Sequence, residues 1–467
     1  MAQPSSMKVV EVCWVAPKPS SPDSASPDDQ SLPLTFFDLL WLRFPPIQRV
    51  FFYEISSFNT PLFFDSILPK LKASLSLTLQ HFLPLAGNLT WPQDSQKPFL
   101  SYVKGETLSL TIAESDADFY HLVSTNNFNI EAKEYHPLIP QLAVSHDQAA
   151  VMALQITIFP NCGFSIGSAV HHAALDGKTS TSFLKLWAHL CKHGGLSSSL
   201  LPEPPKPCYD KRAVKDPAGI EAIYLKEWLN AGGPNNTSLM SLGVKEFPLD
   251  SIRGTFEFTR AKIEALRQSV MTMMAKKKQQ DHSVLHLSTF SLTCAYTWVC
   301  LVKAEEIKAE KVLLVFSADC RSRLDPPLPA TYFGNCIAGR GVVAETKGLL
   351  GEDGLFVALN AISESIKSLD KTVLDGAETW VSRMLNALQT TDRVHSIAGS
   401  HTFGIYEATD FGWGRPMKID FVSIDRTGAI SFSDSKNGAG GVEVGLVLKK
   451  HYMEAFASLF ARGLEDL

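Results

Sequence analysis

Early in the chain, hydrophobic residues recur with the period of a helix. The apolar positions at spacings of three and four are Phe64, Leu68, Leu71, Leu75 and Leu79. Residues three and four apart share one helical face, so this spacing predicts an amphipathic helix over 62–79. Pro84 and Gly87 follow this segment and predict its end.

A second stretch alternates in the manner of a β-hairpin. Residues 154–159 and 164–172 are predicted to form two strands, joined by a turn at 160–163 that contains proline, asparagine and glycine. Thr179 or Ser180 is expected to cap the helix that follows, because a hydroxyl side chain can accept a hydrogen bond from a free amide in the first turn.

A segment rich in proline and serine divides the chain. Residues 196–217 hold three consecutive serines and five prolines, a composition typical of an extended connector. We therefore expect an N-terminal domain at 1–195, a linker at 196–217 and a C-terminal domain at 218–467. The second half again mixes helices and strands, which indicates the α/β class. Its predicted elements are helices near 262–274, 285–302 and 355–369, a strand at 312–316, and a hairpin with arms near 430–433 and 442–448.

The composition limits the classes of function. The chain has 467 residues, of which 45% are hydrophobic and 19% are charged, which excludes an intrinsically disordered or collagen-like chain. Its formal net charge of −5 gives no basic footprint for nucleic acid and no polybasic signal for a membrane surface. Residues 285–302 lack Asp, Glu, Lys and Arg, but their His, Ser and Thr residues favour a buried core helix over a membrane span.

Cysteine spacing and the first residues bear on the compartment. The eight cysteines contain no CxxC pair and are expected to be reduced thiols. Residues 1–19 lack a basic region followed by an apolar run, so we expect no signal peptide. These observations favour a cytoplasmic protein, and we expect a monomer.

One candidate nucleophile lies in the returning strand. Residues 163–167, GFSIG, match the GxSxG pattern of a hydrolase, which requires its serine on a sharp turn from a strand into a helix. Here the pattern continues as strand, and alternation places Ser165 opposite Phe164, Ile166 and Val170, on the face expected to be less buried. A serine hydrolase using Ser165 is the alternative from another class.

A metal site has weak support. His189 and His193 are four apart on the predicted helix and therefore share a face. No third ligand and no neighbouring glutamate accompany them, so we expect no metal site.

His172 is a candidate general base. Alternation groups it with Phe164, Ile166 and Val170, so it is expected to point inward at the end of the strand. Asp176 follows four positions later. An imidazole with a pKa of about 6.5 suits proton transfer at neutral pH. A structural histidine within the core is the alternative.

Three motifs, taken together, resemble those of one enzyme family. They are HAALD at 172–176, YFGNC at 332–336 and DFGWG at 410–414. Their order resembles the HxxxD and DFGWG motifs of the BAHD family of plant CoA-dependent acyltransferases. YFGNC is similar to the signature of its anthocyanin and flavonoid glucoside acyltransferase branch. Further similar segments lie at 34–41, 81–87 and 319–321.

The resemblance implies a fold and a reaction. The fold is two similar α/β domains of mixed sheet, with a channel between them that CoA enters from one side and the acyl acceptor from the other. The reaction moves an acyl group from a CoA thioester to a hydroxyl, with His172 as general base and no covalent intermediate. Asp176 then has a structural role and pairs with Arg321.

The resemblance also assigns roles to four further residues. Asp410 belongs to a motif described as shaping the CoA region, and a proton-accepting role makes it a second catalytic candidate. Trp413 is expected to be a packed corner in a tight turn. Ser288 and Thr289 resemble the family's CoA-contacting pair, and helix capping is the competing explanation for them.

The branch implies the substrates. Its members use malonyl-CoA or hydroxycinnamoyl-CoA to acylate sugar hydroxyls of flavonoid, anthocyanin and phenolic glucosides. We favour malonyl on overall similarity, with hydroxycinnamoyl as the alternative donor. A malonyl carboxylate in a cleft needs a cation, for which the candidates are Lys178, Arg43 and Arg49. We expect acyl-CoA as co-substrate and no bound cofactor. A binding protein that keeps the motifs without turnover is a further alternative.

Overall fold

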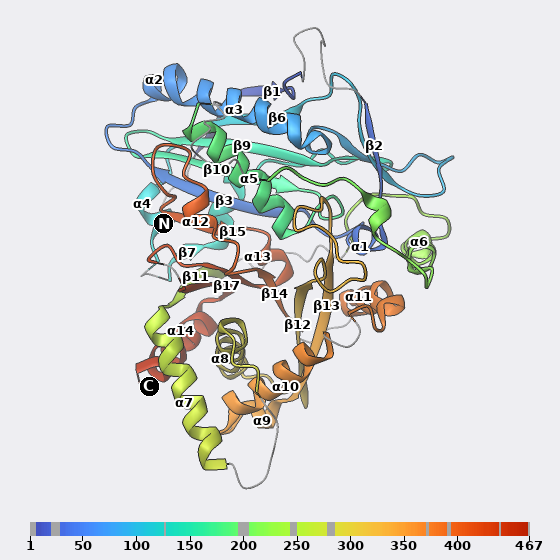
Figure 1. Ribbon diagram of the computed structural model, residues 1–467. Helices are drawn as coiled ribbons and strands as arrows, with labels where there is room; N and C mark the ends of the chain where they lie inside the picture. The colour runs from blue at the N-terminus through green and yellow to red at the C-terminus, as the bar shows by residue number, and fades with distance from the viewer. Residues whose placement is uncertain are drawn as a thin grey trace.

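The computed structural model describes residues 6–19, 29–125, 128–194, 205–242, 250–277, 285–369, 373–389, 394–438 and 440–465. Its strands form two large sheets and one small sheet, and helices pack against both large sheets, which confirms the predicted α/β class (Figure 1). In Figure 1 one large sheet lies in the upper body of the molecule and the other in the lower body. Among the described helices, none is long and apolar enough to cross a membrane.

The first large sheet is built around the predicted hairpin. Its strands in spatial order are β1 (Met7–Val15), β6 (Leu108–Ser115), β9 (Met152–Phe159), β10 (Gly163–Val170), β3 (Ile47–Glu54) and β15 (Lys418–Phe421). β9 and β10 pair antiparallel along their whole length, which confirms the hairpin. Every residue of both strands is buried, because they are central strands of the sheet. The less buried face expected for Ser165 is therefore wrong, since this residue is 0% exposed.

Two helices lie side by side on this sheet (Figure 1). The first continues from α2 (Thr60–Leu62) through a π-helical turn (Phe63–Ile67) into α3 (Leu68–His81), which confirms the helix predicted over 62–79. The second is α5 (Gly177–Lys192). Its cap is Asp176, whose Oδ1 accepts a hydrogen bond from the Thr179 amide at 2.9 Å. The expected caps, Thr179 and Ser180, are wrong because they already lie inside the helix.

The second large sheet holds most of the strands of the C-terminal half. Its order is β13 (Ile337–Glu345), β12 (Lys311–Asp319), β14 (Val394–Gly399), β16 (Ile430–Asp434), β17 (Val442–Lys449), β11 (Ser251–Phe258) and β7 (Ile130–Glu131). β16 and β17 form the predicted hairpin, and β12 contains the predicted strand at 312–316. The helices packed around it are α7 (Arg260–Lys277), α8 (Thr289–Ala304), α10 (Gly354–Leu369) and α14 (Lys450–Glu465).

Helix α8 explains the charge-free segment at 285–302. It packs against α7, α10 and α14, and nearly all of its residues are buried, which confirms the core helix. The expected start at residue 285 is wrong by one turn, because the helix begins at Thr289 after the Ser288 cap.

The remaining elements are short. The small sheet has the order β2 (Gln30–Pro33), β5 (Phe99–Tyr102), β4 (Asn88–Thr90) and β8 (Gln148–Ala150). The other helices are α1 (Phe36–Leu39), α4 (Phe119–Val123), α6 (Ile220–Asn230), α9 (Thr346–Leu350), α11 (Trp380–Gln389), α12 (Ile405–Ala408) and α13 (Ile424–Thr427), with 3₁₀ turns at Leu83–Ala86, Ala132–Leu138, Lys211–Ala213 and Ala377–Thr379. Residues 195–204, which include the first part of the expected linker, lie outside the described residues.

The two large sheets exchange strands across the linear division of the chain. β15 comes from the C-terminal half and pairs with β3 in the first sheet. β7 comes from the N-terminal half and pairs with β11 in the second sheet. The sheet-and-helix bodies therefore do not coincide with the segments 1–195 and 218–467, and the domain bounds stay a prediction.

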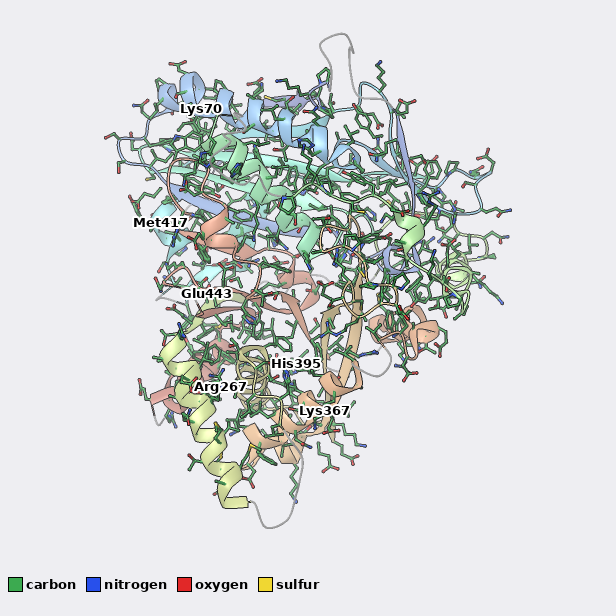
Figure 2. The ribbon with its side chains drawn as sticks, in the orientation of Figure 1. Lys70, Arg267, Lys367, His395, Met417 and Glu443 are labelled. Carbon is green, nitrogen blue, oxygen red and sulfur yellow. The ribbon has the colours of Figure 1, made fainter. Side chains whose placement is uncertain are left out.

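Buried charges lie between the two sheets, near the exchanged strand β15. Arg253 of β11 forms ion pairs with Asp420 of β15 at 3.1 Å and with Asp425 at 3.3 Å. Glu443 of β17, which lies between the upper and lower bodies in Figure 2, accepts a hydrogen bond from the Tyr406 hydroxyl at 2.7 Å. These contacts satisfy polar groups that water cannot reach, so they link the sheets.

We expect Arg253→Met to lower the free energy of unfolding by about 3–5 kcal/mol, because it removes the guanidinium shared by two buried carboxylates. Among ion-pair partners in the described part of the chain, Asp420 then keeps only Lys418 at 3.8 Å, and Asp425 keeps only the His136 ring. Urea denaturation would measure the change. Lys367→Met is the matched control, since Lys367 pairs with Glu364 at 3.1 Å on an exposed surface and should change stability little. Equal effects of the two substitutions would contradict the prediction.

Candidate active site

His172 follows β10 in a turn that leads into α5. The strand ends at Val170, so residues 171–175 do not continue its alternation. The predicted position of His172 on the same strand face as Val170 is therefore wrong, because the strand ends before His172. The His171 amide donates to the Val151 carbonyl at 2.9 Å, and the His171 side chain is buried. His172 keeps partial exposure, so it is the histidine of the pair that a substrate can approach.

Two aromatic rings that follow α1 fix the orientation of the His172 ring. Trp41 stacks on it with centroids 4.0 Å apart and planes within 5°. Phe44 meets it edge-on, with a centroid separation of 5.5 Å. Neither aromatic residue stands out in the sequence, although Trp41 ends the segment at 34–41, which is mostly apolar and is similar to the family.

The surroundings of His172 keep its imidazole neutral. Burial lowers the pKa of His172 to about 4, interactions with Asp176 and Asn335 oppose this only in part, and the charge of Arg49 adds to it. Burial lowers the pKa of His171 to about 4 as well. At neutral pH the His172 ring is therefore a proton acceptor and carries no charge.

Both carboxylate oxygens of Asp176 accept hydrogen bonds that stabilise the fold. Oδ1 caps α5, and Oδ2 accepts hydrogen bonds from Arg321 Nη1 at 2.8 Å and from the Cys336 amide at 3.1 Å. The pairing of Asp176 with Arg321 that the resemblance implies is thus present. Arg321 also donates to the carbonyls of Tyr332 and Gly334, both at 3.1 Å. The pair consequently joins the first turn of α5 to the YFGNC segment.

Asp410 lies at the opposite end of α5 from His172. Its Oδ2 accepts a hydrogen bond from Lys192 Nζ at 2.6 Å, at the last residue of the helix. From Gly177 to Lys192 the helix spans about 22 Å at its usual rise of 1.5 Å per residue. Burial alone would raise the pKa of Asp410, but hydrogen bonds from Lys192 and two backbone amides outweigh this and lower it.

The DFGWG segment forms a tight turn. Asp410 Oδ1 accepts hydrogen bonds from the amides of Gly412 and Gly414 at 2.8 and 3.0 Å. Both glycines have positive φ values, 108° and 105°, which residues with a Cβ rarely adopt. Trp413 between them packs edge-on against Phe164 at 6.2 Å, in agreement with the packed corner that was expected.

The other candidate residues occupy different places. Ser288 caps α8 by accepting a hydrogen bond from the Ser291 amide at 3.1 Å, and Thr289 is the first residue of that helix. Lys178 pairs with Asp319 at 2.8 Å. Arg43 donates to three backbone carbonyls in the segment after α6, at 2.5 to 2.8 Å.

Ser165 does not sit at a nucleophile elbow. It lies in the middle of β10, opposite Phe52 of β3 and Thr157 of β9, and its buried hydroxyl has no hydrogen-bond partner. A nucleophilic serine needs an exposed hydroxyl on a turn from strand to helix. The geometry therefore argues against the serine hydrolase alternative.

The rings of His189 and His193 lie 4.7 Å apart near the end of α5. Within the described part of the chain, no group of three or more His, Cys, Asp or Glu side chains is arranged to hold a metal ion.

Relatives of known activity resemble the chain along almost its full length. It is 40% identical to phenolic glucoside malonyltransferase 1 of Arabidopsis thaliana, over 99% of this chain and 98% of the relative. It is also 40% identical to malonyl-CoA:anthocyanidin 5-O-glucoside-6''-O-malonyltransferase of the same plant, over 99% of each chain. Agmatine coumaroyltransferase, again from that plant, is 39% identical over 97% of this chain and 98% of its own length.

A solved structure and a family model agree with these relatives. The crystal structure of vinorine synthase superposes with a TM-score of 0.68 at 21% identity, covering 97% of this chain and 98% of that one, so the two share a fold. Residues 18–462 match the model of the Transferase family. From its motifs, its fold and these relatives, the chain belongs to this family, the BAHD acyltransferases, and is an enzyme that uses an acyl-CoA co-substrate.

Proposed function

We propose that this enzyme transfers a malonyl group from malonyl-CoA to a sugar hydroxyl of a phenolic, flavonoid or anthocyanin glucoside, with His172 as general base. One observation carries the proposal: a partly exposed imidazole follows β10, and a buried guanidinium, Arg49, lies on the neighbouring strand opposite Ser168 and has no ion-pair partner among the described residues. The malonyltransferases at 40% identity support both donor and acceptor.

The chemistry requires one proton acceptor and one leaving group. A sugar hydroxyl is a poor nucleophile when neutral, so a placed base contributes roughly 10²–10⁴-fold to the rate. His172 takes the hydroxyl proton while the oxygen attacks the thioester carbonyl. The tetrahedral intermediate then collapses, and the carbon–sulfur bond breaks to release CoA as a thiolate, which the proton neutralises. No acyl-enzyme is needed.

Arg49 is the strongest of the three candidates for the malonyl carboxylate. It is 3% exposed, donates one hydrogen bond to Thr181 Oγ1 at 3.2 Å, and its Nε has no partner. Burial lowers its pKa to about 10, so it stays charged at neutral pH. A buried cation without a carboxylate is costly, and a substrate carboxylate would offset that cost. Lys178 and Arg43 already have partners.

The surroundings of Arg49 also suit an anion. A methyl group added at Gly177 would lie 3.5 Å from Arg49 Nη2, so the guanidinium adjoins the positive end of α5. A bulky uncharged hydroxycinnamoyl group would leave the charge of Arg49 unpaired, so the malonyl donor fits better than the coumaroyl donor suggested by the agmatine coumaroyltransferase relative.

The remaining assignments follow from position. We assign Asp410 a structural role, because its carboxylate is taken up by the DFGWG turn and by Lys192. Ser288 and Thr289 stay candidates for a CoA contact in addition to their place at the start of α8. The channel between the domains, the cytoplasmic location and the monomeric state stay predictions.

We expect His172→Ala to abolish transfer from malonyl-CoA to phenyl β-glucoside, a loss of at least about 10²-fold in kcat, because the base is removed. Product mass in a timed assay would measure it. Ser165→Ala should keep most activity, since this serine is buried in mid-strand. The reverse pattern, with Ser165 essential, would support the hydrolase instead. A wild-type enzyme that binds malonyl-CoA without turnover would indicate a binding protein.

The pH profile tests the state of the base. His172 acts when neutral, and its pKa is lowered to about 4, so activity should be lost only as pH falls towards 4. We therefore expect kcat/KM to be nearly constant between about pH 5 and 7.5. Circular dichroism over the same range would verify that the protein stays folded. An acidic limb near the ordinary histidine value of about 6.5 would contradict the assignment.

Arg49→Gln should separate donors. It removes the charge but keeps a polar side chain, so kcat/KM for malonyl-CoA should fall about 10–100-fold, in line with 1.5–3 kcal/mol for a hydrogen bond to a charged group. Acetyl-CoA lacks the free carboxylate of malonyl-CoA, so its kcat/KM should stay the same or rise. Equal losses of kcat/KM for both donors would mean that Arg49 does not bind the malonyl carboxylate.

A further inference from the structure

A lysine of the connector between the two halves is buried beside the active site. Lys211 begins a 3₁₀ turn (Lys211–Ala213) that Asp210 caps, within the described part of the predicted linker. Its side chain is only 3% exposed. Lysine is almost never fully buried unless it is paired, and connectors usually run over the surface, so this position is unusual.

The amino group of Lys211 neutralises one buried carboxylate. Its Nζ lies 2.9 Å from Oδ2 of Asp38, a residue of α1 that is 0% exposed. The rings of Tyr332 and Phe333 lie 5.1 and 5.9 Å from the same Nζ. The backbone at Gly334 packs tightly against the Lys211 amino group, because a Cβ added to Gly334 would come within 2.2 Å of it.

Asp38 uses both oxygens to join three segments of the chain. Oδ2 also accepts from the amide and the hydroxyl of Thr35, each at 3.0 Å. Oδ1 accepts from the Asn335 amide at 2.8 Å and from Asn335 Nδ2 at 3.2 Å. The carboxylate therefore ties the linker and the start of α1 to the YFGNC segment.

Asn335 continues this network to the general base. Its Nδ2 donates a second hydrogen bond, to the His172 carbonyl, at 2.9 Å. Its Oδ1 and His172 Nδ1 are both buried and both lack a hydrogen-bond partner. α1 leads into Trp41 and Phe44, the two rings that enclose the imidazole.

We propose that Lys211 is a positioning residue for acyl transfer: its ion pair with Asp38 orients Asn335, and Asn335 holds the backbone of His172, whose ring Trp41 and Phe44 enclose. This inference rests on the proposed role of His172 as the base. Without the lysine charge, Asp38 is a buried carboxylate with no cation, and the Asn335 amide loses its fixed acceptor. His172 then samples orientations that do not reach the substrate hydroxyl.

The test is a single-turnover measurement in which the enzyme is in excess over malonyl-CoA. Phenyl β-glucoside is the acceptor. Once the enzyme concentration is saturating, the rate constant no longer changes with the amount of folded enzyme, and the amplitude is set by the limiting malonyl-CoA. Lys211→Met should lower the rate constant about 10–100-fold and leave KM for malonyl-CoA within about twofold. A merely structural lysine would lower the melting temperature measured by circular dichroism without changing the saturating rate constant, which would overturn the inference.

A second comparison tests the route through Asn335. Asn335→Ala should lower the rate constant by itself, and adding Lys211→Met should then lower it little further. Additive losses would mean that Lys211 does not act through Asn335. If Lys211→Met does not fold, the double variant that also carries Asp38→Asn can be used instead. It has no unpaired buried charge, so the experiment still distinguishes the two outcomes. The same reduced rate constant is expected for this double variant, and a wild-type rate constant would refute the proposal.

Two controls separate the inference from the proposed function. Lys97→Met removes a lysine from a half-exposed pair with Glu221 at 2.7 Å, which also links the two halves, and should leave the rate constant unchanged. Wild-type enzyme that transfers no malonyl group, or His172→Ala that transfers as fast as wild type, would refute the proposed function. Normal transfer that depends on His172 but not on Lys211 would refute the positioning role alone.

Discussion

The buried pair of Asp176 and Arg321 is the contact on which the site depends. Asp176 caps the helix that lies on the first sheet, and Arg321 follows β12 of the second sheet, so their 2.8 Å ion pair fixes one body against the other. Both side chains are at most 2% exposed. Removing two charges from water is costly, and the hydrogen bonds to Thr179, Cys336, Tyr332 and Gly334 offset that cost.

The carboxylates and the imidazole of the candidate site have different roles. Asp38, Asp176 and Asp410 each have both oxygens occupied by amides or cations, so their hydrogen-bonding capacity serves the fold. The proposed proton acceptor is instead a histidine that burial keeps uncharged and that aromatic rings hold in one orientation. The geometry of this base is thus fixed before substrate arrives, which is how a positioned group lowers a barrier.

Local patterns predicted the elements well and the contacts between them poorly. The helix over 62–79 and the hairpin around 160–163 follow from spacing and turn residues, which are local properties of the chain. The burial of Ser165 could not follow, because alternation does not reveal that helices and flanking strands cover a central strand on every side. The exchange of β7 and β15 depends on pairing between residues more than a hundred positions apart, which no local window contains.

The site residues show the same division. His172 and the Asp176–Arg321 pair could be named because motifs of the family carry them. Lys211 could not be identified from the sequence, since nothing in a proline-rich segment distinguishes one buried lysine from its exposed neighbours. A signal was available in Asp38, a charge inside an otherwise apolar run, which needs a buried partner.

The late position of β15 has a consequence for how the protein is made. The strand at 418–421 completes an edge of a sheet whose other strands all precede residue 171. While the ribosome is still synthesising the intervening residues, β3 presents an open row of amides and carbonyls that another nascent chain could occupy. The first sheet therefore reaches its full strand order only after residue 421 has been synthesised, so its last edge closes late in translation.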